Sequence, residues 1–175
     1  ELLQQQAVVA YPTESVWGLG CDPWSASAVE KILQLKSRNV DKGLILIADC
    51  IERFAPFLAG LEEEQLLRFQ TLTAKPTTWL VPNNGVAPLW ITGGRDTLAL
   101  RVTGHPVAAA LCALISGPLV STSANPQGLP AAKSAAEVAG YFGDAIVMQT
   151  PGQVGSSAKP SEIRYLISGE IVREG

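Results

Sequence analysis

Short apolar segments that alternate with helix-start patterns are the feature that most restricts the fold of this 175-residue chain. A capping-box pattern at Ser27-Ala28-Val29-Glu30 predicts a helix to about Lys36, and Ser134-Ala135-Ala136-Glu137 predicts another to about Phe142. Helical segments are also predicted at residues 52–58, 61–71 and 105–116. The predicted strands are residues 8–11, 43–48, 77–81, 97–102, 118–123, 145–149, 163–166 and 170–173. Because strands and helices alternate, we predict an α/β fold, a single layered domain whose mixed β-sheet is flanked by helices.

The composition is that of a globular domain with a hydrophobic core, because 47% of the residues are hydrophobic and 17% are charged. The net charge of −3 provides no overall positive field, so any polyanion must meet a local basic site. The three cysteines, Cys21, Cys50 and Cys112, form no CxxC pair, which argues against a disulfide framework and a structural zinc site.

The apolar runs are much shorter than the roughly 18–20 residues that cross a bilayer, and no secretory leader is recognised. We therefore expect a cytoplasmic protein with no membrane partner. The chain begins at Glu1 rather than at a methionine, and we expect Leu2 and Leu3 to end a helix that starts earlier in the natural chain.

Several common catalytic motifs are missing from the sequence. It has no GxxxxGK[ST] phosphate loop and no GxSxG elbow, and Gly18-Leu19-Gly20 followed by Pro23 does not match GxGxxG. We interpret Gly18 and Gly20 as residues that shape the backbone of a tight turn. The single histidine, His105, precedes Pro106 at a predicted helix start, where a capping or solvent-facing role is at least as well supported as a general base.

Polar and basic side chains instead gather at the ends of predicted strands, where α/β sheets usually bind ligands. Thr13 and Glu14 follow the first strand, and Lys36, Arg38 and Lys42 lie between the first helix and the next strand. This basic group suits phosphate, although a solvated helix C-terminus explains it equally well when it is taken alone.

Three further groups follow the same pattern. In an alternating strand, Thr97, Ala99 and Arg101 share one face, so Arg101 could receive a carboxylate. Ser121, Ser123 and Asn125 end a strand, where a plain Ser/Asn turn is the alternative interpretation. Ser161 follows a Gly/Ser-rich loop, residues 152–159, that could fold over a ligand.

Six segments in a fixed order resemble a known family. They are YPTESVWGLG (11–20), LKSR (35–38), KGLILIA (42–48), LALRVTGHP (98–106), PLVSTSANPQGLP (118–130) and KPSEIR (159–164). Together they resemble the YrdC/Sua5 family of threonylcarbamoyl-AMP synthases, and most closely its short single-domain bacterial form. The resemblance implies one YrdC-like domain over residues 1–175, with a twisted mixed sheet of the YrdC/RibB type.

The resemblance also implies a function. Such enzymes, which are nucleotidyltransferases, make L-threonylcarbamoyladenylate and pyrophosphate from L-threonine, bicarbonate and ATP. A separate threonylcarbamoyl transferase complex uses the product to form the t6A base of tRNA. Mg²⁺ is expected with ATP rather than on protein side chains, and no catalytic residue is assigned. The resemblance implies that threonine is bound by Thr13, Arg101 and Ser121, and that ATP is bound by Lys36, Arg38, Thr97, Ser123, Asn125 and Ser161.

The sequence departs from the family pattern at two places. Thr73-Ala74-Lys75-Pro76 replaces a Trp-Pro-Gly-Pro-like stretch, and Asn39 replaces a proline, which makes Lys42 an additional candidate for phosphate or RNA contact. The rival hypothesis is a non-catalytic module that binds double-stranded RNA or tRNA. The net charge of −3 and the missing basic stripe weigh against tight RNA binding.

Overall fold

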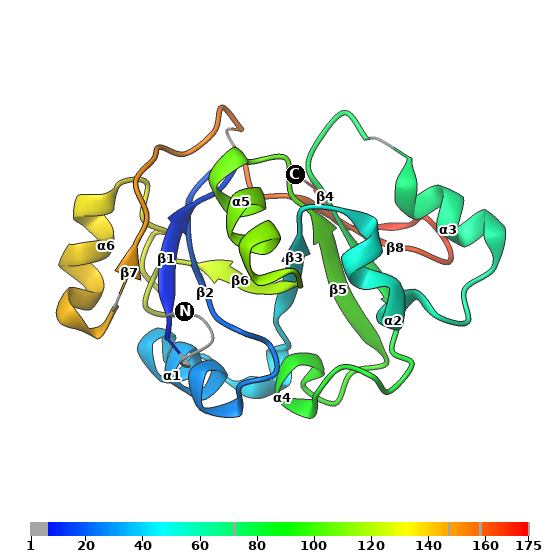
Figure 1. Cartoon of the computed structure of the whole chain (residues 1–175), viewed down its shortest axis with the longest axis horizontal. Coiled ribbons are helices and arrows are strands. Elements are labelled where there is room, and N and C mark those ends of the chain that lie inside the picture. Colours follow the sequence, from blue (N-terminus) through cyan, green and yellow to red (C-terminus); the bar gives the residue numbers. More distant parts are fainter. Residues whose placement is uncertain (1–6, 72, 147, 158, 175) are drawn as a thin grey trace.

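Figure 1 shows the computed structural model of the chain, which describes residues 7–71, 73–146, 148–157 and 159–174. The described residues form a twisted, open, mixed sheet in the order β7-β1-β2-β6-β3-β5-β4-β8-β9. The predicted α/β fold is therefore confirmed, while Leu2 and Leu3 lie outside the described residues. The strands are β1 (Val9–Pro12), β2 (Trp17–Gly20), β3 (Ile45–Ala48), β4 (Thr77–Pro82), β5 (Thr97–Val102), β6 (Leu119–Ser123), β7 (Met148–Gln149), β8 (Glu162–Tyr165) and β9 (Ile171–Arg173).

The helices begin close to the predicted positions. Ser134 caps its helix as predicted, because its hydroxyl accepts the Glu137 N–H at 3.2 Å. The first helix starts earlier than predicted, because the hydroxyl of Ser25 accepts the Ala28 N–H at 3.3 Å. The helices are α1 (Ala26–Lys36), α2 (Ala55–Leu58), α3 (Glu63–Gln70), α4 (Leu89–Thr92), α5 (Pro106–Ile115) and α6 (Ala135–Phe142), with 3₁₀ turns η2 (Val40–Lys42), η3 (Ile51–Phe54) and η4 (Gly143–Ala145). Across the described ranges, no helix combines the length and apolar character needed to cross a membrane.

Three segments differ from the prediction. The helix predicted at 52–58 is a 3₁₀ turn followed by the short α2, which has a proline in its first turn. Residues 89–92 lie outside every predicted helix and strand but form α4, and the strand predicted at 145–149 is reduced to the two residues of β7.

The largest difference is β2, which occupies the segment predicted to be a glycine turn. The tight turn is present one step earlier, where the Thr13 N–H donates to the Val16 carbonyl at 3.0 Å. Glycine is disfavoured in strands, so local preference argues against β2. A Cβ atom on Gly20, however, would lie 2.5 Å from the Val120 carbonyl oxygen and 2.8 Å from the Tyr11 ring. Glycine is thus required by close packing between β1 and β6.

The sheet has two differently covered faces. Helix α5 packs on one face against Val9, Tyr11, Ile47 and Leu119, with the buried Cys112 on its inner side. The larger core lies on the opposite face, where α1 and α2 pack over residues such as Leu46. Because α5 covers only part of its face, the neighbouring part remains open for a site.

Candidate active site

A cavity of about 280 Å³ lies on the open part of the sheet face that α5 partly covers. The face follows from strand alternation: Leu119 packs under α5, so Ser121, two residues along β6, points to the same side. Ile47 also packs under α5 and is paired in register with Arg101 on β5. The cavity brings together seven of the residues selected from the sequence, namely Thr13, Arg38, Arg101, Ser121, Ser123, Asn125 and Ser161.

Arg101 is almost fully buried, with 9% of its surface exposed. Its Nη2 atom lies 3.9 Å from Oε2 of Glu14, and its Nε atom has no hydrogen-bond partner among the described residues. The predicted alternation of β5 holds for the buried Leu98 and Leu100, but Val102 is exposed because it lines a second cavity. Arg101 therefore presents unused N–H capacity in a buried position.

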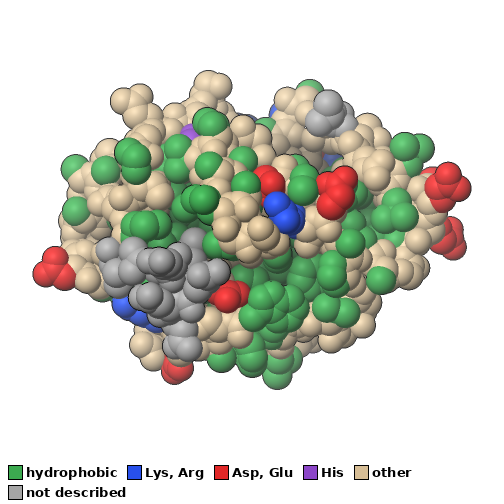
Figure 2. Space-filling model, in the orientation of Figure 1, with side chains coloured by type: hydrophobic (Ala, Val, Ile, Leu, Met, Phe, Trp, Pro, Cys, Tyr) green, Lys and Arg blue, Asp and Glu red, His purple; other side chains and the backbone are tan. Residues whose placement is uncertain are grey.

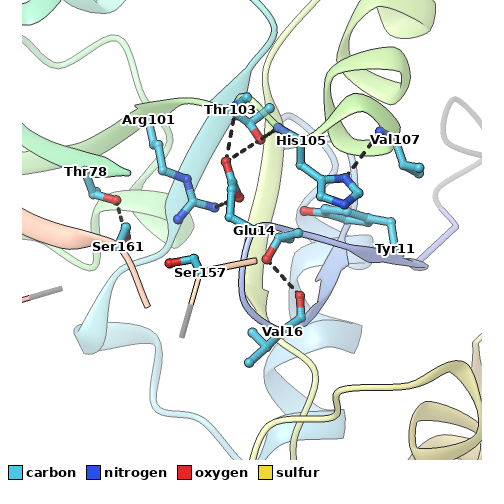
Figure 3. Close-up of polar contacts among 12 residues, drawn as sticks. Tyr11, Glu14, Val16, Thr78, Arg101, Thr103, His105, Val107, Ser157 and Ser161 are labelled. Carbon is cyan, nitrogen blue, oxygen red and sulfur yellow. Dashed lines mark hydrogen bonds and ion pairs between the residues drawn. The ribbon is translucent and has the colours of Figure 1, made fainter. Parts of the chain in front are cut away.

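Glu14 was left without a role by the sequence, and the structure pairs it with Arg101 (Figure 3). Its Oε1 atom accepts hydrogen bonds from the Thr103 hydroxyl at 2.9 Å and the Gly104 N–H at 3.2 Å. Burial alone would raise the pKa of Glu14. The positive charge of Arg101 and these hydrogen bonds outweigh burial and hold that pKa below its ordinary value. The carboxylate is thus ionised at neutral pH.

Lys36 does not line the cavity, because its buried ammonium group donates to the loop after β6. The acceptors are the Ser123 carbonyl, the Asn125 carbonyl at 2.9 Å and Oδ1 of Asn125 at 3.1 Å. Burial, with a smaller contribution from the nearby charge of Arg38, lowers the pKa of Lys36 to about 8. Lys36 therefore braces the loop that carries Ser123 and Asn125.

The other basic candidates lie at different depths. Arg38 lines the cavity and donates from Nη2 to the Gly43 carbonyl at 3.0 Å, and its buried Nε atom lacks a partner among the described residues. Burial and then the charge of Arg95 lower the pKa of Arg38. Lys42, at the end of η2, is exposed and lies outside the cavity lining, as does Thr97 at the start of β5.

Arg173 on β9 also lines the cavity and was not selected from the sequence. Its Nη2 atom donates to the Ser161 carbonyl at 2.7 Å, and the Ser161 and Thr78 hydroxyls are hydrogen-bonded at 2.8 Å. Burial, and then the charge of Arg101, lower the pKa of Arg173. The signal was a basic residue in the last predicted strand, but nothing in the sequence indicates that this strand reaches the cavity.

The charged side chains in the described lining of the cavity are all positive. Its described lining contains three arginines, Arg38, Arg101 and Arg173, and no acidic residue. Guanidinium groups beside serine hydroxyls bind carboxylates and phosphates. The arrangement can therefore hold an anionic or zwitterionic ligand against a phosphorylated one.

His105 does not act as a general base at this site. Nδ1 of His105 accepts the Val107 N–H at 3.3 Å, which caps α5 (Figure 3). Nε2 of His105 bonds to the Gln153 carbonyl at 2.9 Å. Because Nδ1 accepts, Nε2 carries the proton. The capping role predicted for His105 is confirmed.

A larger cavity of about 510 Å³ lies beyond Glu14, but its described lining contains no arginine.

On the face shown in Figure 2, Lys and Arg side chains are few and form no stripe. Within the described ranges, no three His, Cys, Asp or Glu side chains gather as a metal site.

Comparison with known proteins gives consistent results. A family model described as Sua5_yciO_yrdC, Telomere recombination, matches residues 1–175. The chain is 50% identical over 172 residues to a threonylcarbamoyl-AMP synthase of Cellvibrio japonicus, covering 98% of this chain and 91% of that protein. It is 54% identical over 166 residues to a threonylcarbamoyl-AMP synthase of Stutzerimonas stutzeri, covering 95% and 89% of the two chains.

Solved structures agree in fold. P. abyssi Sua5 complexed with L-threonine aligns with a TM-score of 0.87 at 30% identity, covering 97% of this chain. This chain spans 50% of that longer Sua5 chain. E. coli YciO aligns with a TM-score of 0.84 at 21% identity, covering 99% of this chain and 85% of YciO.

Proposed function

This chain belongs to the Sua5/YciO/YrdC family, and we propose that it is a threonylcarbamoyl-AMP synthase, an enzyme of the transferase kind. More specifically, it is a nucleotidyltransferase that forms L-threonylcarbamoyladenylate and pyrophosphate from L-threonine, bicarbonate and ATP. The observation that carries this assignment is the arginine-rich cavity, whose described lining has no acidic residue, in a chain about 50% identical to named synthases.

The threonine end of the site is assigned to Arg101, Thr13 and Ser121. The guanidinium of Arg101 pairs with the threonine carboxylate, because its buried Nε has no hydrogen-bond partner among the described residues. The Thr13 hydroxyl donates to the Val16 carbonyl at 2.8 Å, so its oxygen remains an acceptor facing the cavity. Ser121, on β6 of the same lining, contributes a second hydroxyl.

The ATP end is assigned to Arg38 and Arg173, whose charges match a triphosphate, with Ser123, Asn125 and Ser161 as polar contacts. Lys36 serves ATP indirectly by bracing the Ser123–Asn125 loop. The exposed Lys42 and the half-buried Thr97 are outer contacts, reached by a nucleotide that extends beyond the cavity. This division places the threonine carboxylate and the ATP phosphates on different guanidinium groups.

Mg²⁺ enters with ATP. The described lining of the cavity offers arginines for phosphate and no carboxylate for a metal, so a bound ion would be held by phosphate oxygens and water. When bound, it neutralises charge on the phosphates.

The chemistry requires positioning and charge neutralisation more than proton transfer. The threonine amine combines with bicarbonate and loses water to form a carbamate, whose oxygen attacks the α-phosphorus as pyrophosphate leaves. Arg101 holds the amino acid, while Arg38 and Arg173 stabilise negative charge on the phosphates. No side chain of the cavity is required as a covalent nucleophile.

The product passes to a threonylcarbamoyl transferase complex that modifies tRNA, and the enzyme works in the cytoplasm. A non-catalytic RNA-binding module is not favoured, because the close relatives are named as synthases. Contact between tRNA and Lys42 can be tested separately with a salt-titrated gel shift, where no affinity near physiological salt would reject it.

The synthase assignment is tested by measuring pyrophosphate release and the adenylate product by mass spectrometry. Release should require ATP, threonine and bicarbonate together, and release without threonine or without bicarbonate would contradict it. Arg101→Ala should raise the threonine KM by 10- to 100-fold, because a charge-assisted pair is worth about 1.5–3 kcal/mol. Arg53→Ala, which removes an arginine paired with Asp49 outside the cavity, is the matched control.

A further inference from the structure

Among the described residues, one carboxylate oxygen of Glu14 accepts hydrogen bonds and the other accepts none. Oε1 accepts hydrogen bonds from the Thr103 hydroxyl and the Gly104 N–H. Oε2 is buried, faces Nη2 of Arg101 at 3.9 Å and has no hydrogen-bond partner in the described part of the chain (Figure 3). The second oxygen therefore supplies charge to Arg101 without forming a hydrogen bond to it.

Arg101 depends on this charge. Its guanidinium is buried and lies close enough to Arg173 for the two positive charges to interact unfavourably. An unpaired buried cation is costly. Glu14 provides the acidic partner that the described structure gives Arg101.

The backbone of Glu14 is fixed as well as its side chain. Its carbonyl accepts the Ser157 N–H at 3.0 Å, and the neighbouring Thr13 carbonyl accepts the Gly155 N–H at 2.9 Å. The two segments are in close contact, because a Cβ on Gly155 would lie 2.8 Å from the Glu14 carbonyl oxygen. Contacts of both the backbone and the side chain of Glu14 thus fix the position of its carboxylate.

We propose that Glu14 is a positioning residue, which holds the Arg101 guanidinium in the orientation that receives the substrate carboxylate. This role rests on the proposed function, in which that carboxylate belongs to threonine. The 3.9 Å separation is part of the arrangement, because a closer bidentate pair would occupy the N–H groups that the substrate needs.

The test is equilibrium binding of L-threonine by calorimetry, compared between the wild-type protein and Glu14→Gln. The glutamine keeps the size and an oxygen that can accept from Thr103 and Gly104, but it removes the charge. We expect the threonine Kd to rise about tenfold, while the KM for ATP changes less than twofold and the variant stays folded with only a modest loss of stability at neutral pH. Glu14→Asp, which keeps the charge on a shorter side chain, should restore part of the affinity.

Glu64→Gln is the matched control, because it removes a carboxylate from an exposed pair with Arg68 on α3. It should leave threonine binding unchanged. A threonine Kd for Glu14→Gln within twofold of wild type would overturn the proposal. So would a parallel loss of threonine affinity, ATP affinity and thermal stability, because it would indicate a merely structural residue.

The proposal and the synthase assignment can fail independently. A wild-type protein that binds threonine without releasing pyrophosphate refutes the synthase and leaves the Kd comparison valid. If the wild type does not bind threonine, the rate at which phenylglyoxal modifies Arg101, followed by peptide mass spectrometry, replaces the Kd. Glu14→Gln should raise that rate severalfold, and an unchanged rate would overturn the positioning role.

Discussion

Replacing Gly20 with alanine should destabilise the protein by about 2–3 kcal/mol, although neither its φ angle nor its strand position forbids a side chain. The added Cβ would lie 2.5 Å from the Val120 carbonyl oxygen, whereas ordinary contact begins near 3.4 Å. It would also press on the Tyr11 ring, whose hydroxyl donates to the same carbonyl at 3.2 Å. Overpacking costs up to about 3 kcal/mol, a disturbed hydrogen bond about 1 kcal/mol, and the stiffer unfolded chain returns about 0.4–1 kcal/mol.

Gly18→Ala is the matched comparison in the same strand. Its Cβ would meet the Thr122 carbonyl oxygen and Thr13 at 3.4 Å, which is normal contact, so only the stiffer unfolded chain contributes and stability should rise by no more than about 1 kcal/mol. Urea unfolding followed by circular dichroism measures the free energy of unfolding of both variants, and in thermal unfolding Gly20→Ala should lower the melting temperature by roughly 4–12 °C. If the two variants unfold within about 0.5 kcal/mol of each other, the explanation of β2 by close packing is wrong.

The remaining predictions concern charge. Lys36 needs its ammonium form, because a neutral amine has two N–H groups for three acceptors, so the KM for ATP should rise as pH passes through about 8. Lys36→Met should show a raised, pH-independent KM over that range. The lowered pKa of Glu14 contributes stability that is present above its ordinary value of 4.5 and is lost as pH falls through the lower folded value. The stability difference between wild type and Glu14→Gln should therefore shrink below pH 4.5. Chelation of Mg²⁺ should abolish pyrophosphate release, and the protein without ATP should not bind Mg²⁺ in calorimetry.

For each of these predictions, a specific experimental result would contradict it. An ATP KM that rises above pH 8 equally in Lys36→Met would assign the alkaline change to another group. A stability difference for Glu14→Gln that persists at low pH would show that the carboxylate is not preferentially ionised in the folded state. Tight Mg²⁺ binding to the nucleotide-free protein would contradict a metal that enters with ATP.

The elements that the sequence predicted well are those specified by nearby residues. The Ser134 cap, the His105 cap and the run of β3 depend on side chains and backbone groups only a few positions apart. The segment that forms β2 was wrongly predicted to be a turn, because its glycines disfavour a strand locally. The requirement for glycine comes from Tyr11 and Val120, which lie on two different neighbouring strands.

Sequence motifs also selected most of the polar side chains that line the arginine-rich cavity, including Arg101 and Ser161. Tertiary structure decided which of the charged groups meet. Lys36 reaches Asn125, 89 positions away, and Arg173 enters the cavity from the last strand. Glu14 pairs with Arg101 across the same fold. Residue types and local periodicity are set along the chain, but charge pairing depends on distances of a few ångströms that exist only after distant segments pack together.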